Sequence, residues 1–443
     1  MIFPRFGLDG WRVKAALALA VLLLLIPVPG YIVGCLGGAW KYEPEELDER
    51  LSPVARALVD GAFAGLSEVG AVDHHCHVIG LDTNDSGTWV NPELVHGFHL
   101  ERRATGAVYM SAAGIDDEED ADRQYVDRLV RLARAFGHST RIHLLAFDHY
   151  HRPDGTVDLE RSEFHVPNSY VFELAERNPE LFVPVISVHP YREDALEELD
   201  QWGAKLAAWP GTPTPLVKWL PPAQGIDPSD DRIDPYYALM KKHGLVLLTH
   251  TGEEQAVEAE EDQGLANPLL FRRPLDLGVP VIMAHSASLG TDVDLDDPAR
   301  PRVPSHELFL RMMDHACYEG LLYGELSAMI QRNRIPEPLV TLLARDDLHA
   351  RLVNGSDYPL PAVNVVISVG ALESEGLLVD ADVPLLREIY DVNPLLFDLV
   401  VKRRLRHPES GRRFPPEVFG PLQRTDPKPR DPDCRRHVVP RPR

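Results

Sequence analysis

Short apolar runs alternate with segments of helical periodicity over most of the chain. We predict nine strands in the region from about residue 70 to residue 359, and most of them are continuously apolar. Such runs are typical of strands that are covered on both faces in a parallel sheet. The predicted strands are 71–75, 107–111, 142–147, 182–188, 216–220, 245–250, 279–285, 321–327 and 352–356. The alternation predicts an α/β fold.

Helical segments are expected between these strands. Residues 123–136 repeat apolar side chains at helical spacing. We expect Asp234 to cap a helix that stops near Gly244, and Ser305 to cap a helix that reaches Cys317. Residues 382–406 predict one closing helix or two.

The polar residues that follow the strands favour one architecture over another. A doubly wound open sheet and a closed barrel give the same alternation, and nine strands are one more than a barrel needs. The ambiguous pair lies between residues 105 and 150. Polar side chains recur at strand C-terminal ends, where barrel active sites lie. We therefore favour a (β/α)8 TIM barrel that begins near residue 70, after a helical lead-in over 41–69.

The first forty residues predict a membrane signal or anchor. Arg12 and Lys14 precede 25 uncharged residues from Ala15 to Ala39. The sequence before Cys35 resembles a lipoprotein signal with Cys35 as the lipidated residue, whereas an uncleaved helix could span a bilayer. Basic residues before the stretch and acidic residues after it place the domain on the periplasmic or extracellular face in both readings.

Composition limits the partners. The net charge of −23 argues against nucleic acid, which needs a basic surface, and favours a small-molecule substrate. Residues 401–443 run against this trend, with 13 Lys or Arg, 5 Asp or Glu and nine prolines, and predict a basic tail that is extended or wraps the domain. The four cysteines predict no disulfide framework. The oligomeric state stays open, with a homodimer as one option.

The segment Asp73-His74-His75-Cys76-His77 is the strongest chemical signal. His75 and His77 are two residues apart in a strand, so both side chains leave the same face. Paired imidazoles at a strand end suit a divalent metal, although ordinary polar residues can occupy the same positions. Cys76 points to the opposite face, which favours a core position over a ligand role.

Three later strand ends carry further groups for the same chemistry. His250 is the expected third nitrogen ligand, and Asp357 can bind a metal and accept a proton from water. His285 is a ligand or, as we favour, a general acid or base that is catalytic. A loop histidine and a turn aspartate are the plainer alternatives for His250 and Asp357.

Two other charged residues are candidates for binding substrate. Lys218 lies inside an apolar strand, where burial is costly unless the side chain is paired or modified. It could be carboxylated between two metals, bind a substrate carboxylate, or form a structural ion pair. Glu254, four residues after His250, is expected at the rim of the pocket.

Taken in order, the motifs Asp-x-His-x-His, His-Thr-Gly, Ala-His-Ser and Gly-Ser-Asp-Tyr-Pro resemble the amidohydrolase superfamily. The chain is most similar to the branch that includes aminocarboxymuconate-semialdehyde decarboxylase and many metal-dependent hydrolases, over about residues 70–400. The resemblance implies one divalent metal or two, most often zinc, held by His75, His77, His250 and Asp357. It also implies a role for His285, which matches a histidine that is catalytic in mononuclear members and a metal ligand in binuclear ones.

The resemblance sets the functional expectation. We expect a metal-dependent hydrolase in which activated water attacks an amide, lactone or ester carbonyl, with Asp357 and His285 as its catalytic residues. The alternative is a non-oxidative decarboxylase or hydratase that uses the same centre on a carboxylated substrate.

Overall fold

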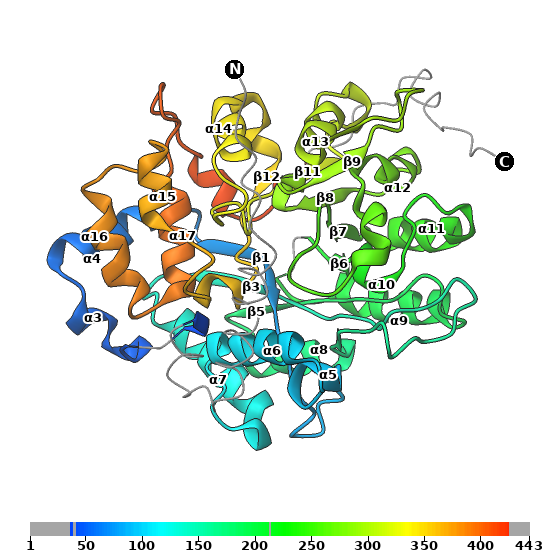
Figure 1. Ribbon diagram of the computed structural model, residues 1–443, viewed down its shortest axis with the longest axis horizontal. Helices are drawn as coiled ribbons and strands as arrows, with labels where there is room; N and C mark the ends of the chain where they lie inside the picture. Colours follow the sequence, from blue (N-terminus) through cyan, green and yellow to red (C-terminus); the bar gives the residue numbers. More distant parts are fainter. Residues whose placement is uncertain (1–35, 39–40, 212–213, 425–443) are drawn as a thin grey trace, which may run out of the picture.

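Eight parallel strands form the centre of the computed structural model, which describes residues 36–38, 41–211 and 214–424 (Figure 1). Three of them pair in the order β1-β3-β5 and five in the order β12-β11-β8-β7-β6. Their bounds are β1 Ala71–His77, β3 Thr140–Leu145, β5 Phe182–Val185, β6 Leu216–Trp219, β7 Val246–His250, β8 Val281–Ala284, β11 Leu322–Glu325 and β12 Leu352–Val353. Short antiparallel pairs are added by β2 Trp89–Val90 with β4 Phe164–His165, and by β9 Thr291–Val293 with β10 Arg302–Pro304.

The two parallel sheets meet at two seams. Ile186, just after β5, bridges to Val217 in β6. At the other seam the His74 amide of β1 donates to the carbonyl of Asn354, just after β12, at 3.0 Å. The α/β fold with parallel strands is therefore confirmed, and its arrangement is that of a distorted (β/α)8 barrel.

Helices surround the strands on the outside (Figure 1). The helices that follow the first parallel strands are α6 Leu100–Ala113, α7 Ala121–Arg134, α8 Asn168–Arg177, α9 Ala195–Ala207 and α11 Asp234–Lys242. Later come α12 Arg272–Asp276, α13 Ser305–Met313, α14 Glu337–Ala344, α15 Val369–Ser374, α16 Asp382–Tyr390 and α17 Pro394–Arg404. Shorter or N-terminal helices are α3 Leu47–Arg50, α4 Pro53–Phe63, α5 Pro92–Val95 and α10 Pro221–Gln224.

The barrel has a small interior core of its own. Leu145, Val185, Leu248 and Ile282 are fully buried in it, together with strand neighbours that point the same way. Leu422 joins this cluster from the C-terminal segment, and the Asn354 amide donates to the Val418 carbonyl at 2.9 Å. The described part of the basic tail thus packs on the barrel. The larger core lies between strands and helices.

Several sequence-based expectations need correction. Residues 107–111 were expected as a strand but belong to α6, which ends at Gly114 with φ +78°. Of these residues, Tyr109 and Met110 line a cavity, and the short apolar run did not distinguish a helix from a strand. Asp234 and Ser305 are the first helical residues and not N-caps, because their side chains bind Arg273 and Asp292 instead.

The chain ends are only partly described. Among residues 36–38, 41–211 and 214–424, no helix is long and apolar enough to cross a membrane. Residues 1–35 and 39–40 of the predicted signal or anchor, including Cys35, lie outside the described residues, as do residues 425–443 of the tail. Cys317 is disulfide-bonded, a bond that the prediction of no disulfide framework did not anticipate.

Candidate metal centre

The ends of β1 and β12 bring three predicted ligands together, His75, His77 and Asp357. Asp357 Oδ1 lies 3.4 Å from His75 Nε2 and 3.3 Å from His77 Nε2. Asp357 has a left-handed backbone with φ +59°, and its amide donates to the His75 carbonyl at 2.7 Å. The His77 amide in turn donates to the Tyr358 carbonyl at 3.1 Å. Hydrogen bonds to β1 therefore hold the strained aspartate in place.

Burial and charge set the protonation of this cluster. Burial alone would raise the pKa of Asp357, but the imidazoles of His75, His77 and His285 outweigh it and hold that pKa well below its usual range. Burial lowers the pKa of His75 and of His285 well below the usual value for histidine. The cluster thus brings one carboxyl oxygen and two imidazole nitrogens together, which is the donor set that zinc and similar divalent cations prefer.

Glu325, at the end of β11, is a functional residue that sequence reasoning missed. Its Oε2 lies 3.3 Å from His75 Nδ1 and accepts from Ser327 Oγ at 2.6 Å. The contact orients the His75 ring so that Nε2 faces Asp357. A Cβ on Gly355 would collide with the Glu325 carboxylate, so the close approach requires glycine there. A glutamate inside the apolar run 321–327 was the available signal.

His285 lies beside the three ligands. Its Nε2 is 4.0 Å from Asp357 Oδ2, and its Nδ1 is 2.8 Å from Ser327 Oγ and 3.1 Å from the Ser327 carbonyl. Because the Ser327 hydroxyl donates to Glu325, Nδ1 of His285 carries the proton and donates to Ser327. The Nε2 lone pair is then directed toward Asp357.

Lys218 also reaches the centre, from β6. Its Nζ lies 2.9 Å from His75 Nε2, and the side chain is 1% exposed. Burial lowers the pKa of Lys218 to about 8, although three nearby carboxylates raise it. The lysine occupies space next to the nitrogen that a metal would bind.

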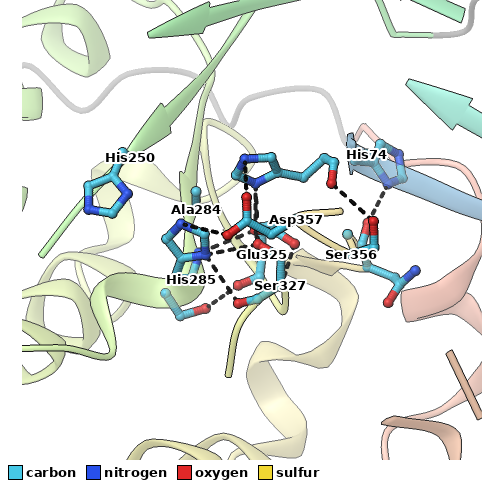
Figure 2. Close-up of polar contacts among 12 residues, drawn as sticks. His74, His250, Ala284, His285, Glu325, Ser327, Ser356 and Asp357 are labelled. Carbon is cyan, nitrogen blue, oxygen red and sulfur yellow. Dashed lines mark hydrogen bonds and ion pairs between the residues drawn. The ribbon is translucent and has the colours of Figure 1, made fainter. Parts of the chain in front are cut away.

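His250 and Glu254 are held by each other at the edge of the site. His250 Nδ1 lies 3.1 Å from Glu254 Oε2, and its Nε2 lies 3.1 Å from the Gly252 carbonyl. Figure 2 shows His250 set apart from the other labelled side chains. His250 is therefore not within ligand distance of the cluster of His75, His77 and Asp357, although it lines the same small pocket and its ring centroid lies 5.0 Å from that of His285.

The cluster opens into two adjoining spaces. A pocket of about 70 Å³ is lined by His75, His77, Lys218, His285 and Asp357. Beside it lies a cavity of about 810 Å³. Tyr109, Phe164 and Glu254 line both spaces, so the cavity and the pocket are adjacent.

The chain was compared with protein families and with solved structures. A model of the family described as Amidohydrolase matches residues 72–365. The solved structure of 5-carboxyvanillate decarboxylase from Sphingomonas paucimobilis is 12% identical, covers 75% of this chain and 96% of its own, and has a TM-score of 0.39. A structure of that enzyme from Novosphingobium aromaticivorans, with manganese and 4-hydroxy-3-methoxy-5-nitrobenzoic acid, is 12% identical, covers 74% and 92%, and has a TM-score of 0.38.

No curated protein matches the chain. The family match is nevertheless broad, since it spans more than half of the sequence and contains all the residues of the candidate centre. The chain belongs to the amidohydrolase family and is a metal-dependent enzyme.

Proposed function

We propose that the protein is a metal-dependent hydrolase that cleaves an amide, ester or lactone. The observation that carries the proposal is the position of an ionised Asp357 between the Nε2 atoms of His75 and His77. These three residues would hold the metal, which we propose to be zinc. When bound, the metal would supply Lewis acidity toward water and toward the carbonyl oxygen.

His250 is proposed as a further metal ligand, provided that its ring first leaves its present hydrogen bond. Its Nε2 now lies against the Gly252 carbonyl, so it would have to leave that contact before joining the site. Glu254, 3.1 Å from Nδ1, would then keep the ring oriented, as a carboxylate behind a metal-bound histidine commonly does.

Asp357 and His285 would move the protons of the reaction. Asp357 accepts a proton from the attacking water, because its pKa is low enough to keep it ionised. His285 Nε2, 4.0 Å from Asp357 Oδ2, can take up that proton through its free lone pair and deliver it to the leaving group. Ser327 holds the opposite ring nitrogen during both transfers.

The charge of the cavity favours hydrolysis over the decarboxylase or hydratase alternative. Seven Asp or Glu residues line the cavity against two Arg. A decarboxylase must admit a substrate that is already anionic, and this lining would repel it. An uncharged amide, ester or lactone meets no such barrier.

The chemical state of the Lys218 side chain should depend on whether one metal or two are bound. A charged ammonium 2.9 Å from His75 Nε2 would oppose a cation there. We propose that Lys218 either turns to bind substrate at a single metal or is carboxylated between two. Metal analysis with isotope-labelled bicarbonate distinguishes these cases, because only the carboxylated lysine retains the label.

We also propose that the N-terminal segment tethers the enzyme to a membrane, with the barrel on the periplasmic or extracellular face. The charge pattern around residues 15–39 and the disulfide-bonded Cys317 support this location, since disulfides persist in oxidising compartments. Recovery of the full-length protein in the cytosolic fraction would contradict it.

The test of the hydrolase is Asp357→Asn in the full chain, assayed with zinc and a panel of amides, esters and lactones. Loss of the carboxylate should lower turnover by at least about 100-fold, within the range of lost acid–base catalysis. Asp391→Asn, at a surface ion pair with Lys41, is the matched control and should keep full activity. Unchanged turnover in Asp357→Asn would refute the assignment.

A further inference from the structure

The cavity beside the metal centre is much larger than the centre itself requires. It encloses about 810 Å³, against about 70 Å³ for the pocket at His75, His77 and Asp357. Tyr109 and Phe164 form part of both walls, so the two spaces adjoin. A substrate whose carbonyl lies at the centre therefore has room for a long substituent.

One face of α6 builds a wall of this cavity. Residues at helical spacing along it line the space, namely Arg102, Thr105, Gly106, Tyr109, Met110 and Ala113. Val90, Leu94 and Val257 add apolar surface from other segments. The wall thus suits an apolar chain, which gains free energy for each methylene removed from water.

The charges around the cavity disfavour a negatively charged ligand. Its carboxylates outnumber its guanidinium groups by seven to two. Arg102 is already paired with Glu163 and Glu258, and Arg302 donates to Thr291. The two arginines therefore offer little to an anion, and the remaining field favours an uncharged or cationic ligand.

Another face of α6 holds the point where the N-terminal segment reaches the barrel. Gly37 is buried, and a Cβ there would collide with the Val108 carbonyl of α6. The Asn364 amide donates to the Leu36 carbonyl at 3.0 Å, and Leu36 and Val365 are apolar residues 41% and 52% exposed. Leu36 and Gly37 belong to the uncharged stretch, residues 15–39, that we propose as the tether. The cavity wall and the tether therefore share one helix.

From these observations, we propose that the substrate is an amphiphile without negative charge. Its apolar chain would occupy the α6 cavity while its carbonyl lies at the metal centre. The chain could be drawn from the bilayer or taken from solution, because both sources present the same chemistry. The identity of the reacting bond rests on the proposed hydrolase function, whereas binding of the chain does not require the reaction.

The proposed chain site is tested by binding of short and long amphiphiles to the full-length, metal-free protein in phosphatidylcholine nanodiscs. Hexyl and decyl amines, alcohols and carboxylates are titrated by calorimetry, and partition into empty nanodiscs is subtracted. Affinity should rise about fourfold for each added methylene, and decanoate should bind more weakly than decylamine or decanol. Thr105→Trp, which fills the cavity, should remove the chain-length dependence. Arg103→Trp, on the exposed side of the same helix, is its control.

Equal affinity for hexyl and decyl homologues would overturn the proposal, as would decanoate binding as tightly as decylamine. These comparisons use the wild-type chain, so they hold even if Thr105→Trp fails to fold. Decyl probes preloaded in the bilayer identify the source: uptake from the lipid supports a membrane substrate, and uptake only from solution supports a soluble amphiphile. Chain binding without hydrolysis of any decyl amide or ester would remove the proposed reaction and leave the chain site standing.

Discussion

Glu325 illustrates how a single buried carboxylate can orient the candidate centre. It contacts His75 Nδ1 and accepts hydrogen bonds from the Ser327 hydroxyl and the His285 amide. Glu325→Gln keeps the size of the side chain but removes its charge, so the His75 ring loses the partner that orients Nε2. We expect metal affinity to fall by about 10–100-fold, the usual effect of losing such a partner. Competition with a chelator measures this.

The same substitution separates orientation from folding. Glu337→Gln, at the start of α14, is the matched control and should bind metal as the wild type does. Circular dichroism of Glu325→Gln should show an intact barrel, because the change preserves volume. Wild-type metal affinity in Glu325→Gln would show that His75 is oriented by its strand alone.

At the scale of elements, α17 carries a buried ion pair behind the centre. Lys402 Nζ donates to Asp398 Oδ2 at 2.6 Å and to the Gly355 carbonyl at 2.5 Å. Burial raises the pKa of Asp398 from 3.8 to about 7, although the Lys402 charge lowers it. Because the folded pKa exceeds the unfolded one, the stabilisation from this carboxyl is complete below pH 3.8 and is lost as the pH rises through about 7.

Asp398→Asn should therefore flatten the pH dependence of stability. Asparagine resembles the protonated acid, so the free energy of unfolding of the variant should fall less than that of the wild type between pH 3.8 and about 7. Each unit of difference between the folded and unfolded pKa changes the free energy of unfolding by about 1.4 kcal/mol. Asp73, whose pKa burial raises to about 6, retains part of the slope. Urea unfolding at several pH values checks this, and parallel curves for the two proteins would contradict it.

For the whole molecule, the sequence predicted the elements that repeat but not the contacts between them. Eight of the nine predicted strands are strands, since each buried parallel strand leaves a continuous apolar run. Residues 107–111 failed because a helix that lines a cavity is apolar over the same short window. The grouping of His75, His77 and Asp357 follows from strand-end positions. The rotation of His250 toward Glu254 depends on side-chain packing, which no periodicity encodes.

The proposed ligands also join the first and last strands of the barrel. His75 and His77 end β1, whereas Asp357 follows β12, and in this region the amides of His74, His77 and Asp357 join the two segments by backbone hydrogen bonds. A metal held from both sides would close this seam. Zinc should therefore slow amide hydrogen exchange at residues 74–77 and 354–358 more than at β7 and β8, which pair directly over four positions.

The size of the stabilisation by zinc follows from mass action. Free zinc at about 100 times its dissociation constant should stabilise the folded protein by about 2.7 kcal/mol, and a chelator should reverse it. Asp357→Asn provides the control, because it weakens the ligand on the β12 side only. If zinc slowed exchange equally in β7, β8 and the seam, the metal would stabilise the barrel globally and not by joining its ends. Exchange unchanged at the seam would place the metal on β1 alone, since only ligands from both strands can transmit binding across it.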